Sequence, residues 1–377
     1  MKTLILSCNT GEGHNSCARA IKEYYNDKGE VCEIEDSLRF VSQRVSNIIS
    51  KWHVRLYRYT PKLFDKGYNF LEDHPGLSGD HSALHKLFAA GSKKLAEFIR
   101  EGGYDCVICT HTISSTILTD AMRRHGLTLR ATSFLATDYT CHPMACDSGL
   151  DVCFMPDASL TDEFVSHGVP KNTLEVSGIP VRRMFFSRTD KAEAKASLDI
   201  PAGSRHLLVM CGSMGCGPIR ELSADVVKRM PEDAFMTVIC GTNKKLFAEL
   251  SEEYAGSSNV RVLGFTKQIG LLMDSADLYL TKPGGLSTAE AATKHLPMVF
   301  INAVAGCEDG NLRFFVGKGG AITDDDLGVL AEKCVALLSD SAELGRMSQN
   351  LADLNFGDAS AVIYERMRAL AGEPAMV

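Results

Sequence analysis

The sequence predicts an α/β protein built from two doubly wound, Rossmann-like domains. Its 377 residues exceed the roughly 250–300 at which a single core usually stops growing, and 45% of them are hydrophobic. Short apolar runs alternate with amphipathic helical patterns along the chain, as in "TLILSCN" followed by "NSCARAIKEYYND". Strands that alternate with helices form parallel sheets covered by helices on both faces.

Strand patterns occur in both halves of the chain. The first half adds "YDCVICTH", "RATSFLATD", "LDVCFMP" and "TLEVSGIP", and the second has "HLLVMCG", "FMTVICG", "NVRVLGF", "ADLYLTK" and "LPMVFINAV". Between the halves, residues 187–205 are polar. We therefore expect domains over residues 1–185 and 200–355, and a last helix over 356–377 that packs back across the junction. Ligands of such folds lie at the carboxyl ends of the strands, here in the cleft between the domains.

The composition excludes some classes of protein. A formal net charge of −7 argues against a nucleic-acid binder that works by general electrostatics. The N-terminus lacks the apolar region of a signal peptide, and no apolar run reaches the ~18 residues of a membrane span. The 13 cysteines lie largely in apolar runs, which favours buried thiols in a reducing cytosol. Cys106 and Cys109 have a redox or zinc spacing but lie within one strand pattern, which favours a structural role.

The first glycine loop, Gly11–His14, follows the first strand. A dinucleotide-binding fingerprint would require a glycine at position 16, where this chain has Ser16. A tight strand-to-helix turn is one interpretation. The other is a site, because His14 at the start of a helix can serve as a general base near neutral pH.

Two glycine loops in the second half favour a bound anion. Gly212–Pro218 follows a strand and precedes a helix, and it lacks the Lys-Ser/Thr ending of an ATP-binding loop. Pro283–Gly285 also precedes a helix, which begins with Ser287, Thr288 and Glu290. Glu290 has the spacing of a capping box with Ser287, and a carboxylate there also suits ribose hydroxyls. The two loops predict a site for a nucleotide diphosphate.

Acidic residues occur near two later helices. Glu308, Asp309 and Asn311 are candidates to bind the hydroxyls of a sugar, and a helix N-cap is the alternative. The stretch "TDDDLG" at 323–328 resembles a metal-binding Asp-x-Asp, but its place before a helical pattern favours an N-cap turn.

The segment from Leu38 to Phe70 is basic within an acidic chain. Apolar residues recur there at helical spacing, and seven basic residues accompany one acid, Asp65. A basic amphipathic segment that carries Trp52 can lie on an anionic membrane surface. The alternative is a helix that faces the core with a solvated rim.

Taken together, the motifs resemble those of the monogalactosyldiacylglycerol synthase and processive diacylglycerol glucosyltransferase family, and more distantly the lipid II-forming N-acetylglucosaminyltransferase. The resemblance runs from about residue 3 to 340 and rests on "NTGEGHNSCARAI", "LATDYTCHP", "VSGIPVRRMF", "CGSMGCGP", "LGFT", "LTKPGGLSTAEA" and "GCEDGN". It implies a GT-B fold, in which the N-terminal domain meets a lipid acceptor at the membrane and the C-terminal domain binds a UDP-sugar. It also implies inversion at the anomeric carbon, with no metal at the diphosphate.

The resemblance also assigns residues. His14 would be the base, and Asp138 a second candidate for the base or for orienting His14. Phe265 would lie near the uracil, and Glu290 would bind the ribose. The full donor set is Gly212, Ser213, Met214, Gly215, Phe265, Gly284, Gly285, Leu286, Ser287, Thr288, Glu290, Glu308 and Asn311. The acceptor and membrane set is Gly13, Arg44, Trp52, Arg55 and Arg58.

One departure from the family pattern concerns the donor sugar. Many members read Gly-Gln-Glu where this chain has Gly306, Cys307 and Glu308, so an amide is replaced by a weakly hydrogen-bonding thiol. We expect transfer of a hexose from UDP-glucose or UDP-galactose to diacylglycerol, by a cytoplasmic protein peripheral to the inner face of the cell membrane and without a cofactor. A polyprenyl-linked or soluble acceptor, and a catalytically weak UDP-sugar sensor, are the alternatives.

Overall fold

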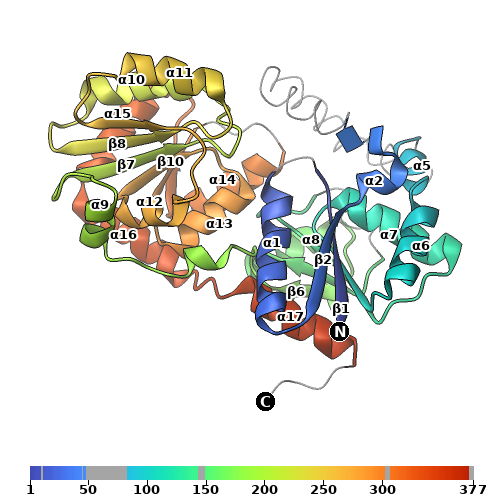
Figure 1. Cartoon of the computed structure of the whole chain (residues 1–377). Helices are drawn as coiled ribbons and strands as arrows, with labels where there is room; N and C mark the ends of the chain where they lie inside the picture. Colours follow the sequence, from blue (N-terminus) through green and yellow to red (C-terminus); the bar gives the residue numbers. More distant parts are fainter. Residues whose placement is uncertain (10–11, 45, 48–82, 143–148, 302–305, 373–377) are drawn as a thin grey trace. The chain divides into compact units, whose positions relative to one another are not determined.

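The computed structural model describes residues 1–9, 12–44, 46–47, 83–142, 149–301 and 306–372 (Figure 1). The chain divides into two compact units. Unit 1 comprises residues 1–182, 305–307 and 357–377, and unit 2 comprises residues 183–304 and 308–356. The roles and boundaries expected for the two domains stay a prediction.

Unit 1 contains a parallel sheet in the order β2-β1-β3-β4-β5-β6. Ile5 lies opposite Ile34 on one neighbouring strand and Ile108 on the other. The order changes direction between β1 and β3, so the crossover connections leave opposite faces of the sheet there. The strands are β1 (Lys2–Ser7), β2 (Val31–Asp36), β3 (Cys106–Cys109), β4 (Ala131–Leu135), β5 (Val152–Met155) and β6 (Leu174–Val176).

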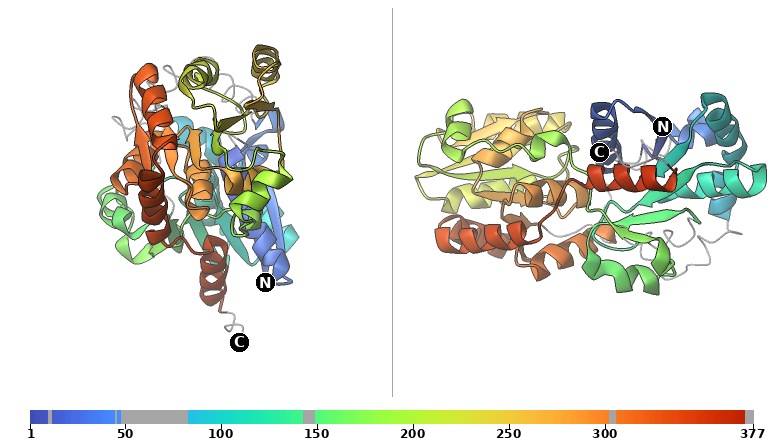
Figure 2. Two further views of the ribbon diagram at one scale, coloured as in Figure 1. Left: turned by 90° about the vertical axis from the view of Figure 1, so that its left-hand side faces the viewer. Right: turned by 90° about the horizontal axis from the view of Figure 1, so that it is seen from below.

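The helices of unit 1 cover both faces of its sheet. The C-terminal helix α17 packs on α1, where the ring of Tyr364 meets that of Tyr25 edge-on at 4.9 Å between centroids (Figures 1 and 2). Helices α6 and α7 pack on each other. The helices are α1 (Glu12–Asp27), α2 (Leu38–Val41), α5 (Ala83–Ala89), α6 (Ser92–Gly102), α7 (Thr112–His125), α8 (Thr161–Ser166) and α17 (Ala359–Leu370).

Unit 2 contains a second parallel sheet, in the order β12-β11-β10-β7-β8-β9. This is the strand order of dinucleotide-binding folds, with its switch point between β7 and β10. Leu280, opposite Val209, is among the buried residues of its core. The strands are β7 (Arg205–Met210), β8 (Ala234–Ile239), β9 (Val260–Leu263), β10 (Leu278–Thr281), β11 (Met298–Phe300) and β12 (Ala321–Thr323).

Helices cover both faces of this sheet as well, with α10, α11 and α15 on one side and α9, α12, α13 and α16 on the other (Figure 1). The helices are α9 (Lys191–Ser197), α10 (Ile219–Arg229), α11 (Lys244–Glu253), α12 (Ile269–Ser275), α13 (Gly285–Thr293), α14 (Cys307–Gly317), α15 (Leu327–Leu338) and α16 (Ser341–Asp353). Short 3-10 turns lie at Ala158–Leu160, Lys171–Thr173 and Arg183–Phe185. The predicted α/β class with two parallel sheets is confirmed.

Three further expectations concern the cysteines, the stretch "TDDDLG" and membrane-spanning helices. No disulfide joins the cysteines of the described residues, and burial raises the pKa of Cys106 to about 12. Asp326 caps α15 by accepting a hydrogen bond from the backbone N–H of Val329 at 3.0 Å, which confirms the N-cap interpretation of "TDDDLG". Among the helices of the described ranges, none has the length and hydropathy that a membrane crossing requires.

Candidate active site

In unit 1, His14 lies in the first turn of α1, beyond the carboxyl end of β1. Its Nδ1 is 2.7 Å from the carbonyl oxygen of Thr110, which follows the neighbouring strand β3. The hydroxyl of Thr137, beyond β4, is 3.1 Å from the same nitrogen. Because a carbonyl oxygen only accepts hydrogen bonds, Nδ1 carries the proton. The basic nitrogen of the neutral ring is therefore Nε2.

Charged and aromatic groups surround this ring. Burial lowers the pKa of His14, and Asp138 partly opposes that effect by electrostatic attraction. The ring of His111 stands edge-on to His14 at 4.5 Å between centroids. Burial, together with repulsion from His14, lowers the pKa of His142 to about 4. His14 is therefore neutral at pH 7, as a general base must be.

The structure brings Asp138 near His14, but the hydrogen bonds that orient the ring come from Thr110 and Thr137. The sequence analysis missed both of these residues, as well as His111 and His142. The available signal for Thr110, His111 and Thr137 was their position directly after strand patterns, in "CVICTH" and "LATD". This signal could not place these residues beside His14, because the sequence does not give the order of the strands.

The residues of unit 1 expected to contact the acceptor or the membrane are only partly described by the structure. Gly13 adjoins His14 in the first turn of α1 and is partly buried. Arg44 is exposed. Trp52, Arg55 and Arg58, and with them most of the basic segment, lie outside the described residues.

In unit 2, the loop Gly212–Gly217 follows β7 and has a fixed shape. Gly212 and Gly215 have φ of 67° and 56°, a left-handed region that favours glycine. A Cβ on Gly215 would lie 2.3 Å from the carbonyl oxygen of Cys240. The segment after β8 holds the loop, because the side chain of Asn243 donates to the Gly215 carbonyl at 2.9 Å.

The second loop, Lys282–Gly285, follows β10, which pairs with β7. Gly284 is the N-cap of α13, so the capping-box alternative for Ser287 and Glu290 is wrong. The hydroxyls of Ser287 and Thr288 donate to the Gly284 carbonyl at 3.1 and 3.0 Å. The first backbone N–H groups of α13, including that of Leu286, have no carbonyl within the helix to bind, and such groups favour a bound anion.

Lys282 joins the two loops, and the sequence analysis did not assign it. Its Nζ forms an ion pair with Glu308. A Cβ on Gly212 would lie 3.2 Å from Lys282 Cε, and one on Gly284 would lie 3.6 Å from Nζ. An ammonium group thus lies between the two glycine loops, where it suits a diphosphate.

The chain is similar to known glycosyltransferases in both of its halves. Residues 14–181 match the monogalactosyldiacylglycerol (MGDG) synthase family, and residues 206–362 match the glycosyltransferase family 28 C-terminal domain. These matches, one to each half of the chain, support the resemblance to the MGDG synthase and processive diacylglycerol glucosyltransferase family. The processive diacylglycerol beta-glucosyltransferase of Bacillus licheniformis is 27% identical over 96% of this chain and 92% of the relative. The enzyme of the same name from Bacillus subtilis is 26% identical over 97% and 94%.

Solved structures agree on the GT-B fold. Acinetobacter baumannii MurG has a TM-score of 0.67 at 13% identity and covers 98% of this chain and 99% of its own. Staphylococcus aureus MnaA, solved with UDP, has a TM-score of 0.64 at 13% identity and covers 100% of both chains. Anabaena Alr3699/HepE, solved with UDP and glucose, has a TM-score of 0.60 at 13% identity, covering 98% and 99%.

The remaining donor-site candidates lie in different surroundings. Phe265 follows β9 and is 68% exposed, so its ring is open to stacking. Glu290 is buried within α13. Asn311 is fully buried, and its side chain donates to the Pro283 carbonyl at 2.9 Å. In this structure Asn311 supports the second loop, and Met214 lies within the first.

Within the ranges that the structure describes, no group of three His, Cys, Asp or Glu side chains is arranged to hold a metal ion.

Proposed function

We propose that this chain is an inverting glycosyltransferase that moves a hexose from UDP-glucose or UDP-galactose to a hydroxyl of diacylglycerol at a membrane surface. The observation that carries the proposal is the oriented, neutral His14, whose Nδ1 proton points to the Thr110 carbonyl. The match of residues 14–181 to the MGDG synthase family, and two relatives named as processive diacylglycerol beta-glucosyltransferases, support the substrate class.

In the proposed reaction, His14 is the general base. Nε2 takes the proton of the acceptor hydroxyl as its oxygen attacks C1 of the UDP-sugar and the bond from C1 to the UDP oxygen breaks. A single displacement of this kind inverts the anomeric carbon. Asp138 then stabilises the imidazolium that forms, because its attraction favours the charged ring.

UDP leaves with negative charge, and we assign its stabilisation to unit 2. The N–H groups at the start of α13 and the ammonium of Lys282 face the same region beyond β7 and β10. These groups are fixed before the reaction, so they stabilise the leaving group without reorganising. Glu290 and Phe265 are the proposed contacts for ribose and uracil. The UDP-sugar is a co-substrate, and this set of groups requires no metal ion.

We also propose that the chain works at the inner face of the cell membrane, from the cytoplasm. The support is the sequence from Leu38 to Phe70, with seven basic residues and one acid. Such a segment attracts an anionic surface. The partners are then the UDP-sugar, the diacylglycerol and anionic lipid.

The first experiment measures UDP release from a panel of UDP-sugars, with and without diacylglycerol in anionic liposomes. Release that depends on both one donor and the lipid supports the proposal and names the sugar. Binding of a donor without lipid-dependent release refutes the diacylglycerol assignment and favours another acceptor. The sensor alternative, suggested by Cys307, predicts that His14→Ala leaves all output unchanged.

A further inference from the structure

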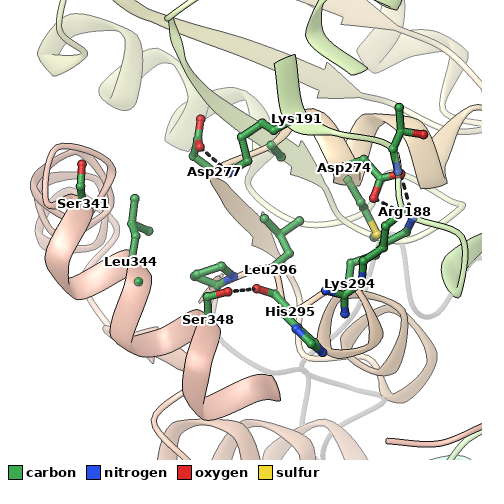
Figure 3. Close-up of a pocket in the computed structure, with 15 residues that line it drawn as sticks. Arg188, Lys191, Asp274, Asp277, Lys294, His295, Leu296, Ser341, Leu344 and Ser348 are labelled. Carbon is green, nitrogen blue, oxygen red and sulfur yellow. Dashed lines mark hydrogen bonds and ion pairs between the residues drawn. The ribbon is translucent and has the colours of Figure 1, made fainter. Parts of the chain in front are cut away.

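A cavity of about 440 Å³ opens in unit 2 at the amino-terminal edge of the sheet (Figure 3). Two of its lining residues, Asp277 and Pro297, immediately precede β10 and β11. The glycine loops follow the opposite, carboxyl ends of β7 and β10. The four residues of β10 separate the two edges by about 13 Å. The cavity is therefore distinct from the candidate donor site.

The cavity has a polar side and an apolar side. In Figure 3, Leu344 and Ser348 project from α16 on one side, and Arg188 lies on the other. Leu296 lies between them, and Met273 adds further buried apolar surface. A pocket of this size with one apolar wall and a few convergent polar groups is typical of small-molecule sites.

The carboxylates of the cavity are already neutralised. Lys294 Nζ lies 2.7 and 2.9 Å from the two oxygens of Asp274. Asp277 lies between Lys191 at 2.6 Å and Lys195 at 3.1 Å. Lys195 does not line the cavity, but with it three lysines against two carboxylates leave a formal excess of one positive charge.

Arg188 adds a second positive charge. Its Nη2 donates to the carbonyl oxygen of Thr293 at 3.0 Å, and no carboxylate of the described residues lies within ion-pair distance of it. The ring of His295 lines the same cavity, and burial together with the charge of Arg188 lowers the pKa of that ring. A bound anion would offset both positive charges.

We propose that this cavity binds the phosphate monoester of a small organic molecule. The forked guanidinium of Arg188 would bind two phosphate oxygens, and Lys191 on the same rim would add charge. The organic part would lie against Leu296 and Leu344. The net excess of two positive charges matches the dianion of a phosphate monoester.

The test titrates glycerol 3-phosphate into the full chain and follows the ring resonances of His295 by NMR, assigned with His295→Gln. UDP is present at saturation, because the glycine loops of the donor site also attract phosphate. We expect a saturable shift in the wild type and at least about tenfold weaker binding in Arg188→Gln, since a charge-assisted pair is lost. Arg229→Gln, an exposed arginine on α10, is the matched control and should bind as the wild type does.

The outcomes separate the proposal from its rivals. Absence of a saturable shift, or equal affinity in Arg188→Gln, overturns it. Equal affinity for inorganic phosphate and glycerol 3-phosphate overturns the organic part of the ligand. Arg188→Lys keeps the positive charge but loses the forked geometry, so it should bind with intermediate affinity. It replaces Arg188→Gln in the test if the glutamine variant folds poorly. Transferase turnover is assayed without phosphate, so its failure would count against the proposed function and not against this site.

Discussion

At the scale of single residues, the protonation of His14 is set by a carbonyl group. The Thr110 oxygen fixes the proton on Nδ1, and burial keeps the ring neutral. A neutral imidazole with an assigned basic nitrogen is what acceptor activation requires. The following predictions depend on that state and on Lys282.

Replacing His14 by Ala or Gln should lower kcat by about 10²–10⁴-fold, because the proton of the acceptor hydroxyl loses its base. Binding of UDP, measured by calorimetry, should not change, since the donor groups lie in unit 2. Unchanged kcat in both variants would remove His14 from the mechanism.

The pH dependence of kcat/KM should follow the same ring. Its pKa is lowered from 6.5, and the unprotonated form is the active one. Activity should therefore rise with pH through a pKa below 6.5 and remain level toward neutrality. A rise centred above pH 7 would assign the base to another group.

Lys282→Met should lower kcat/KM for the UDP-sugar by about 10²–10³-fold, because a cation at the leaving group is lost. The same change leaves Glu308 without its ammonium partner. The double variant Lys282→Met with Glu308→Gln removes that complication. Glu308→Gln alone is the reference: if the double variant is as active as this single variant, Lys282 has a structural role, and if it is weaker by about 10²–10³-fold, the lysine serves the diphosphate.

At the scale of elements, the loop after β7 is shaped by the segment that follows β8. The Ser213 carbonyl accepts a hydrogen bond from Thr242 N–H at 2.8 Å, and Gly241 leaves no space for a side chain beside it. The loop after β7 and the segment after β8 therefore interlock, so the shape of the proposed anion site depends on both.

Gly215→Ala should destabilise the protein by at least about 2 kcal/mol. Its φ of 56° disfavours any side chain, and the added Cβ would lie 2.3 Å from the Cys240 carbonyl oxygen. Thermal unfolding measures the loss. Gly256→Ala is the control, because a Cβ there would have nothing within 4 Å. Equal melting temperatures for the two variants would contradict the geometry.

Sequence patterns located the interior strands and missed one edge strand in each sheet. β2 and β12 end their sheets, and both are only partly buried. β2, "VCEIED", has three acids at partly buried positions, so its hydrophobic pattern is weak. The interior strands are buried on both faces and therefore read as apolar runs.

At the scale of the whole molecule, stability should depend on buried histidines. His206 is fully buried in β7, bonded to Thr237 at 2.9 Å and to Ser275 at 3.0 Å, and burial lowers its pKa to about 4. The unfolded chain binds a proton at pH 6.5 or below. The contribution of His206 to the free energy of unfolding is therefore fully present above pH 6.5 and is lost as the pH falls toward 4. The loss is on the order of 3 kcal/mol. Unfolding of His206→Gln should show a shallower pH dependence over this range than the wild type.

Membrane binding should depend on the basic segment. The triple variant Arg44→Glu, Arg55→Glu and Arg58→Glu should lose most of its binding to anionic liposomes, because each basic residue near the surface contributes about 1 kcal/mol. Co-sedimentation measures this loss. The control changes Lys228, Lys244 and Lys245 of unit 2 to Glu, with the same change in net charge. Equal losses in both variants would refute a specific membrane segment.

The sequence by itself determined the alternation of strands and helices, the glycine loops, His14 and the family resemblance. These features are encoded within a few consecutive residues, where periodicity and glycine placement are visible. The tertiary structure alone decided which strand ends meet. It placed the Thr110 carbonyl on His14 across 96 residues, and Lys282 beside Glu308 across 26. Such pairings depend on strand order and packing, which no local pattern specifies.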